Sequence, residues 1–85
     1  MPYDYILTGH AAFVIAEREI RIEWVERVFA HPERTQPDRS DPDLKHALGR
    51  IEEFGGRVLR VVYNDVTTPK RIITAYLDRT LKGEL

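Results

Sequence analysis

The chain contains no cysteine, which excludes a disulfide framework and a thiolate metal site. It also lacks a long apolar run, because the longest, residues 11–16, is much too short to span a bilayer. No basic segment followed by an apolar stretch opens the sequence, as a secretory signal would. With 85 residues the chain can build one small core, so we expect a single domain over residues 1–85, located in the cytoplasm and without a membrane partner.

The charges have no dominant sign, since 13 basic and 14 acidic residues give a net charge of −1. Such a chain has no general attraction for phosphate backbones, so any RNA contact has to be local. Arginine supplies ten of the 13 basic residues. Its guanidinium pairs well with phosphate and carboxylate, but it also serves ordinary surface ion pairs, so the bias indicates no single ligand.

The common cofactor and metal motifs are missing. The three histidines, His10, His31 and His46, have no short ligand spacing, and no H-E-x-x-H signature occurs. A glycine-rich phosphate loop, a serine elbow and a dinucleotide fingerprint are absent as well. We therefore expect neither a metal nor a cofactor.

The first third of the chain predicts a strand and a helix. Residues 3–7 alternate enough for a short strand, and Thr8 offers a hydroxyl as a helix N-cap. A helix over residues 9–18 follows. Its apolar residues are spread too broadly for a narrow stripe, which predicts that much of this helix is buried.

A second helix is predicted by an apolar stripe at helical spacing. Its members are Ile22, Val25, Val28 and Phe29. Pro32 prevents the helix from continuing past His31. Trp24 lies off the stripe and is either a packing residue or an exposed aromatic for a partner. We favour packing, because large aromatic side chains dominate small cores.

The second half is richer in strand signals. Residues 35–43 have the composition of a loop. Residues 57–63 and 71–77 are rich in β-branched and aromatic side chains, and residues 64–70 would join them as an antiparallel hairpin. Residues 43–54 keep apolar helical spacing, yet Gly49 in the middle and two glycines at the end suit a strand and turn equally well. Local signals leave helix and strand open there.

Several short motifs follow one another in order. They are His10-Ala11, Glu17-Arg18-Glu19-Ile20, Glu23 with Val25, His31-Pro32-Glu33, and the strands at 57–63 and 71–76. Together they resemble domain-of-unknown-function family four-two-five-eight over nearly the whole chain. In one departure, Val14 stands where the pattern often has Arg four positions after the His.

That family is usually grouped with RelE/ParE-like and BrnT-like toxins, and the grouping implies a fold. It is an α+β fold in the order β-α-α-β-β-β-β, with two N-terminal helices packed on one face of a small antiparallel sheet and the other face open. Under this resemblance, residues 45–52 form a strand rather than a helix.

The resemblance implies an activity, metal-independent RNA cleavage, which needs a base, an acid and cations beside the phosphate. Strand alternation puts Arg60 on the open face, and if Ile73, Ala75 and Leu77 join the core, Thr74 and Tyr76 share the face with Arg60. The candidate catalytic residues are His46, Arg60 and Tyr76, with Arg50, Arg71 and Arg79 as RNA- or phosphate-binding residues. Solvated arginines are, however, common on the open face of an antiparallel sheet.

His10 and Arg18 are carried over as residues of the family motif. His10 either locks the junction between strand and helix or faces a functional groove, and we favour the first because a buried apolar run follows it.

Two functions from different classes remain. The first, which is the sharpest testable hypothesis, is a toxin-like ribonuclease, acting on RNA or the ribosome and neutralised by a small antitoxin, which predicts a basic open face. The second is a non-catalytic module that binds another protein, or a second copy through an exposed edge strand, which predicts an open face of mixed charge.

Overall fold

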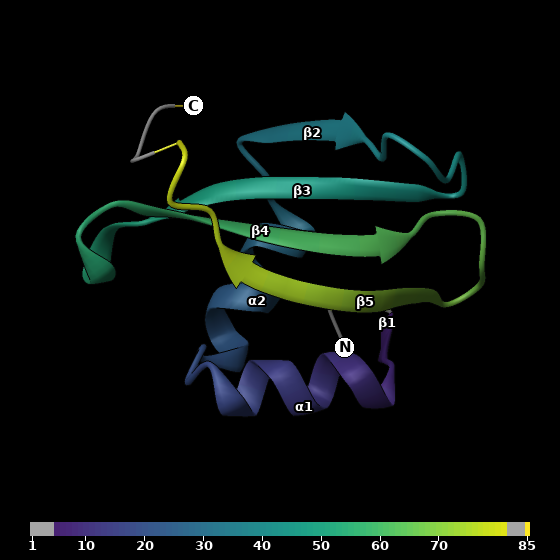
Figure 1. The fold of residues 1–85 in the computed structure, drawn as a ribbon, viewed down its shortest axis with the longest axis horizontal. Coiled ribbons are helices and arrows are strands. Elements are labelled where there is room, and N and C mark those ends of the chain that lie inside the picture. Colours follow the sequence, from purple (N-terminus) through teal and green to yellow (C-terminus); the bar gives the residue numbers. More distant parts are fainter. Residues whose placement is uncertain (1–4, 82–84) are drawn as a thin grey trace.

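The computed structural model describes residues 5–81 and 85. Its elements are β1 (Tyr5–Leu7), α1 (Gly9–Glu17), α2 (Ile22–Ala30), β2 (Arg34–Pro37), β3 (Leu44–Ile51), the short 3-10 helix η1 (Glu52–Phe54), β4 (Arg57–Asn64) and β5 (Lys70–Leu77). Both helices lie on the same side of the sheet: in the view of Figure 1, α2 passes behind the strands and α1 lies below β5. The α+β class and the predicted order β-α-α-β-β-β-β are confirmed.

The sheet has five strands in the order β1-β5-β4-β3-β2. The pairs from β2 to β5 are antiparallel, whereas β1 pairs parallel with β5, so the sheet is mixed. A register irregularity at Val62 and Tyr63 shifts the pairing of β5 by one residue. Because of this shift Ile72, rather than Ile73, joins the core, while Ala75 and Leu77 pack there as expected.

Residues 43–54 form a strand over most of their length, β3, and not a helix. Gly49 allows α2 to approach this strand closely, because a Cβ atom there would lie 3.0 Å from Cγ2 of Val28. Gly55 and Gly56 both have φ of 71°, a left-handed conformation that favours glycine, and they turn the chain into β4.

The prediction of a loop over residues 35–43 was wrong for residues 35–37, because Arg34–Pro37 forms β2. This strand pairs with β3 alone and lies at the edge of the sheet. An edge strand needs no apolar alternation, and it tolerates a proline, which cannot donate to the ladder. Composition therefore indicated a loop where the hydrogen bonds make a strand.

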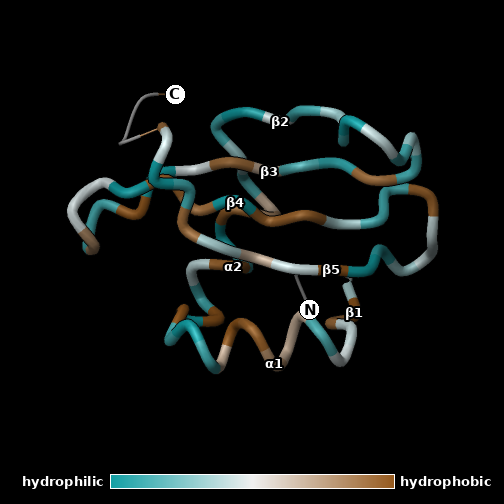
Figure 2. Tube along the Cα trace, viewed as in Figure 1, coloured by the Kyte–Doolittle hydropathy of each residue, from teal (hydrophilic) through white to brown (hydrophobic). Residues whose placement is uncertain are grey.

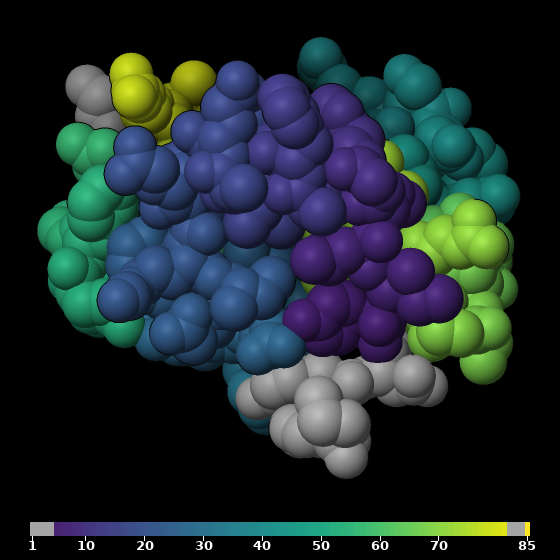
Figure 3. Space-filling view, turned by 90° about the horizontal axis from the view of Figure 1, so that it is seen from below, coloured from purple at the N-terminus to yellow at the C-terminus, as the bar shows by residue number. Residues whose placement is uncertain are grey.

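Helix α1 begins as predicted, with the Thr8 hydroxyl accepting a hydrogen bond from the Ala11 backbone N–H at 3.1 Å. The prediction of a largely buried helix was wrong. Only Ala11, Val14 and Ile15 are buried, and Phe13 is 62% exposed. In Figure 3, which shows the molecule from the side of α1, this helix lies at the surface, so one of its faces meets solvent.

Helix α2 covers the middle of the sheet and ends at Ala30, before Pro32, as predicted. Val25 and Val28 of its stripe are buried. Trp24 is a packing residue, as favoured above, since it is buried and its ring lies 5.4 Å from that of Phe54.

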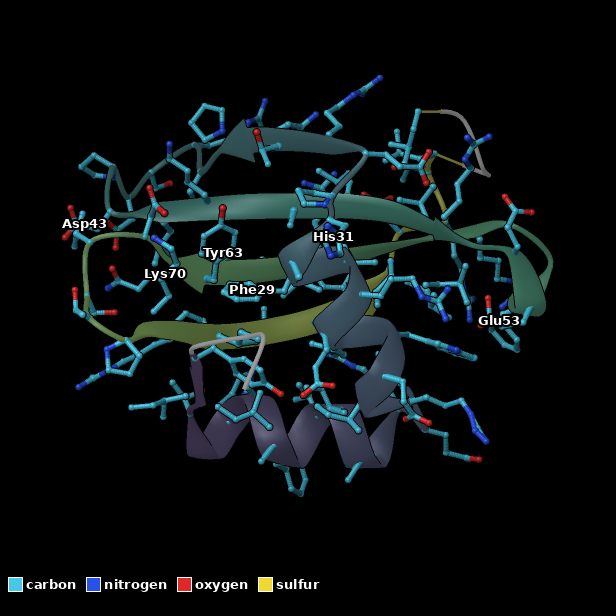
Figure 4. All side chains as sticks on the ribbon, turned by 180° about the vertical axis from the view of Figure 1, so that it is seen from behind. Phe29, His31, Asp43, Glu53, Tyr63 and Lys70 are labelled. Atoms are coloured by element: carbon cyan, nitrogen blue, oxygen red, sulfur yellow. The ribbon has the colours of Figure 1, made fainter. Side chains whose placement is uncertain are left out.

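Aromatic rings fill the space beneath α2 at the other end. Phe29 meets Tyr63 edge to face at 5.1 Å and Tyr5 at 5.6 Å, and Figure 4 shows Phe29 and Tyr63 together at the sheet. Apolar segments run along β3 and β4, while β2 and the loop after it are hydrophilic (Figure 2). Within residues 5–81, no helix is both long enough and apolar enough to cross a bilayer.

Candidate functional site

The face of the sheet opposite the helices carries the predicted catalytic residues. Strand register places two rows across this open face: Arg34, Leu48, Arg60 and Tyr76 in one, and Gln36, His46, Val62 and Thr74 in the next. All three predicted catalytic residues therefore face the same side. Tyr76 is the cross-strand neighbour of Arg60 and remains 36% exposed.

His46 and Arg60 are in direct contact. The Arg60 Nη1 atom lies 2.7 Å from Nδ1 of His46, and the His46 Nε2 atom lies 2.7 Å from Oδ1 of Asp38. Arginine nitrogens only donate, so Nδ1 accepts and the ring proton sits on Nε2, facing the Asp38 carboxylate. Both ring nitrogens thus have partners within the protein, and neither points to open solvent as a free base.

Arg60 also holds the chain that follows β5. Its Nε and Nη2 atoms donate to Oδ2 of Asp78 at 3.0 and 2.7 Å, and Nη1 donates to Oε1 of Gln36 at 3.2 Å. The two charged side chains are only 13% and 9% exposed. Every nitrogen of the guanidinium therefore donates to an acceptor within the protein.

The series of hydrogen bonds through His46 and Arg60 ends in two carboxylates, Asp38 and Asp78, and both are ionised at neutral pH. The hydrogen bond from His46 and the backbone N–H groups of Asp41 and Ser40 lower the pKa of Asp38 to about 2. The pKa of Asp78 is also below its usual value, through its hydrogen bonds with Thr80 first and with Arg60 second. We call Asp38, His46, Arg60 and Asp78 the open-face network, which joins one guanidinium, one imidazole and two carboxylates.

A small apolar layer lies at the same face. Leu48, Val58 and Val62 point away from the helices, yet they are 0%, 0% and 6% exposed. His46 and Arg60, with Gln36 and Tyr76, lie beside Leu48 and Val62 in the two rows. The network thus contributes to the packing of this side of the sheet and ties the loop after β2 and the end of β5 to β3 and β4.

The predicted phosphate-binding arginines do not converge. Arg50 pairs with Glu33 at 2.8 Å. Arg50 and Arg71 face Val58 and Asn64, which are six residues apart on β4 and so roughly 20 Å apart. Arg79 follows β5 and is exposed at the rim of two surface hollows.

The two residues of the family motif lie away from the open face. His10 is exposed in the first turn of α1, on the helical side of the sheet. Arg18 is the C-cap residue of the same helix, and its Nη1 donates to the carbonyl oxygen of Ala75 at 2.8 Å. Arg18 therefore fastens α1 to β5, and Val14 in the same helix is buried.

Sequence reasoning missed three partners of the network: Gln36, Asp38 and Asp78. Gln36 and Asp38 fell in the segment taken as a loop, and only the pairing of Gln36 with His46 shows that they meet β3. Asp78 lies just beyond the last strand, and its backbone N–H bonds to Val58. Among residues 5–81 and 85, no group of three or more His, Asp or Glu side chains is arranged to hold a metal ion.

Comparison with known proteins gives one match. Residues 7–77 match a family described as Domain of unknown function (DUF4258). Neither the comparison with curated proteins nor the comparison with solved structures gives a match. The match covers most of the 85 residues, and the chain therefore belongs to the DUF4258 family.

Proposed function

We propose that this protein is a non-catalytic module, built on a RelE/ParE-like toxin scaffold, that binds another protein in the cytoplasm. The arrangement of two helices on one face of a five-stranded sheet supports the scaffold assignment. The partner is a small protein, such as an antitoxin.

One observation carries the proposal: both ring nitrogens of His46 and the guanidinium groups of Arg50 and Arg60 already have partners within the protein. Asp78 pairs with Arg60, Glu33 pairs with Arg50, and Asp38 accepts from His46. A ribonuclease site needs a free base and cations available to the phosphate. A face that carries both signs of charge, with Arg50 and Arg60 already paired, suits the polar rim of a protein interface, where complementary charges fix the orientation of the partner.

Self-association through a sheet edge has less support. The β2 edge is only four residues long and carries Pro37, and both features weaken a strand as a template for pairing. On the other side, Thr8 and Arg18 donate to the carbonyl oxygens of Ile73 and Ala75, which covers part of the β5 edge. We therefore expect a partner of a different sequence rather than a second copy.

A second candidate function, a metal-independent ribonuclease of a toxin–antitoxin pair, is favoured by one specific contact. Asp38 orients the His46 ring and Arg60 lies against its other nitrogen. If RNA phosphate drew Arg60 away from His46, Nδ1 would become available as a base, with the Arg60 cation beside the phosphate and Tyr76 next to it. This function requires the network to open.

Growth of a bacterial host after tight induction separates the two functions. The parent chain is compared with a His46→Ala, Arg60→Ala, Tyr76→Ala variant, after its folding has been checked by circular dichroism. The module predicts normal growth with both chains at matched soluble levels, and no cleavage of single-stranded RNA by either purified protein. Growth arrest by the parent alone would overturn the module and favour the ribonuclease.

Binding is tested directly with a photocrosslinking amino acid introduced at Tyr76, which is exposed on the open face. The matched control carries the same group at Phe13, which is exposed on the outer side of α1. The proposal predicts a discrete protein adduct from position 76 and none from position 13. Adducts of equal yield from both positions, or only a dimer of the chain itself, would contradict it.

A further inference from the structure

A pair of adjoining hollows lies where α1, β4 and the end of β5 come together. One has a volume of about 460 Å³ and is bordered by Arg18, Tyr76 and Arg79. The other has a volume of about 320 Å³ and is bordered by Arg57 and Arg79. Leu77 and Arg79 belong to both, so the two hollows form one continuous surface, which we call the arginine groove.

Among residues 5–81 and 85, no carboxylate forms an ion pair with the three arginines of this groove, unlike Arg50 and Arg60 of the open face. Arg18 uses one nitrogen on the Ala75 carbonyl, and Arg57 lies over the Phe54 ring at 4.9 Å. These contacts hold two guanidinium groups in place without neutralising their charge. Arg79 is exposed.

The walls between the arginines are aliphatic. Ile20 and Leu77 line the larger hollow, and Val58 and Leu77 line the smaller one. The acidic residue beside them, Asp78, is already bonded to Arg60 and Thr80. A ligand that fits this groove thus carries negative charge to match the arginine rim and an apolar group to cover the aliphatic walls.

We infer that the arginine groove receives an acidic segment of a protein partner, with an aliphatic side chain seated against Leu77. Arginine and tyrosine are the residue types that most often dominate protein interfaces, and the groove presents three arginines and the exposed Tyr76. RNA fits less well, because the groove offers a single aromatic ring and the whole chain carries a net charge of −1. This inference rests on the proposed protein-binding function and names the surface and the chemistry of the partner.

The test uses the full chain and a short peptide of glutamates around a central leucine. Binding is followed by amide chemical shifts in ¹⁵N–¹H spectra at low ionic strength. We expect shifts concentrated at Arg57 and residues 76–79. Replacing the glutamates of the peptide by glutamines removes the charge at nearly constant shape, and we expect this peptide to bind at least about tenfold more weakly.

Two protein variants locate the site. Arg79→Glu should weaken binding of the acidic peptide about tenfold, because it replaces an attraction by a repulsion at an exposed position. Arg39→Glu makes the same charge change in the loop after β2, away from the groove, and should leave binding within about twofold. Arg18→Gln keeps a donor for the Ala75 carbonyl while removing the charge, so it tests Arg18 without detaching α1.

The outcomes separate this inference from the proposal on which it rests. Peptide-induced shifts on another surface, equal binding of the glutamine peptide, or equal losses from Arg79→Glu and Arg39→Glu would overturn the groove as the site but leave a protein-binding module. Tighter binding of single-stranded RNA than of the acidic peptide at the groove, together with RNA cleavage, would overturn both.

Discussion

Replacing Arg60 by methionine removes the central donor of the open-face network while keeping an unbranched, apolar stem of similar length. Arg60 donates four hydrogen bonds, to Asp78, Gln36 and His46. The variant leaves the Asp78 carboxylate, only 9% exposed, without its counter-charge. It also leaves Nδ1 of His46 without a donor.

The expected loss of stability follows from these contacts. Hydrogen bonds to charged groups contribute roughly 1.5–3 kcal/mol each when buried, but solvent near the surface screens them. The two bonds to one oxygen of Asp78 act as a single ion pair, so we expect Arg60→Met to lower the free energy of unfolding by about 2–3 kcal/mol. That is a large part of the roughly 4–13 kcal/mol expected for a chain of this length.

Urea unfolding at pH 7 measures the effect in a double-mutant cycle with Asp78→Asn. If the pair stabilises the fold, the double variant should lose less than the sum of the single losses, with a coupling of about 1 kcal/mol. Arg39→Met is the control and should change stability by less than about 0.5 kcal/mol. A coupling near zero, or a variant more stable than the parent, would refute the structural role of the network and would suggest a site strained for catalysis.

The remaining predictions concern packing and acid stability. Gly49→Ala should destabilise the fold by about 1–2 kcal/mol, because its Cβ would lie 3.0 Å from Val28. Thermal unfolding measures this loss. If the double variant Val28→Ala, Gly49→Ala lost the full sum of the two single losses, the proposed clash between these side chains would be contradicted. The Asp38 carboxyl has a pKa of about 2 in the folded protein, below its ordinary value of 3.8. A lowered folded pKa means that its contribution to stability is present above pH 3.8 and is lost as the pH falls from 3.8 through about 2. Asp38→Asn should therefore reduce the loss of stability between pH 3.8 and about 2, and an unchanged loss would show that the hydrogen bonds of the Asp38 carboxylate with His46, Asp41 and Ser40 contribute nothing.

Much of the fold could be predicted because local signals and periodicity agree in most segments. Thr8 caps α1, Pro32 lies beyond the end of α2, and the alternation in β4 assigns its faces correctly. Residues 43–54 show where local signals fail. Their apolar spacing fits a helix, but β3 lies between β2 and β4, and its pairing with both neighbours outweighs the local preference.

The candidate site was predictable only in part, for the same physical reason. Alternation could bring His46, Arg60 and Tyr76 to one face, because each belongs to a strand with a regular pattern. It could not reveal that Asp38 and Asp78 match them, since both lie outside the strands, at positions set by tertiary structure. The sequence therefore identified Arg60 and His46 but not the carboxylates of Asp78 and Asp38 that bind them. These contacts favour a protein-binding module over a ribonuclease.

The most direct test of the account is the protonation pattern of the His46 ring, read from long-range ¹H–¹⁵N spectra at pH 7. The proposal rests on both ring nitrogens being engaged by Asp38 and Arg60. It predicts a single neutral tautomer with the proton on Nε2, slow exchange of that proton with solvent, and loss of this pattern in the Arg60→Met variant. A proton on Nδ1, or a ring averaging between tautomers in fast exchange with solvent, would contradict the account and leave His46 available as the base of a ribonuclease.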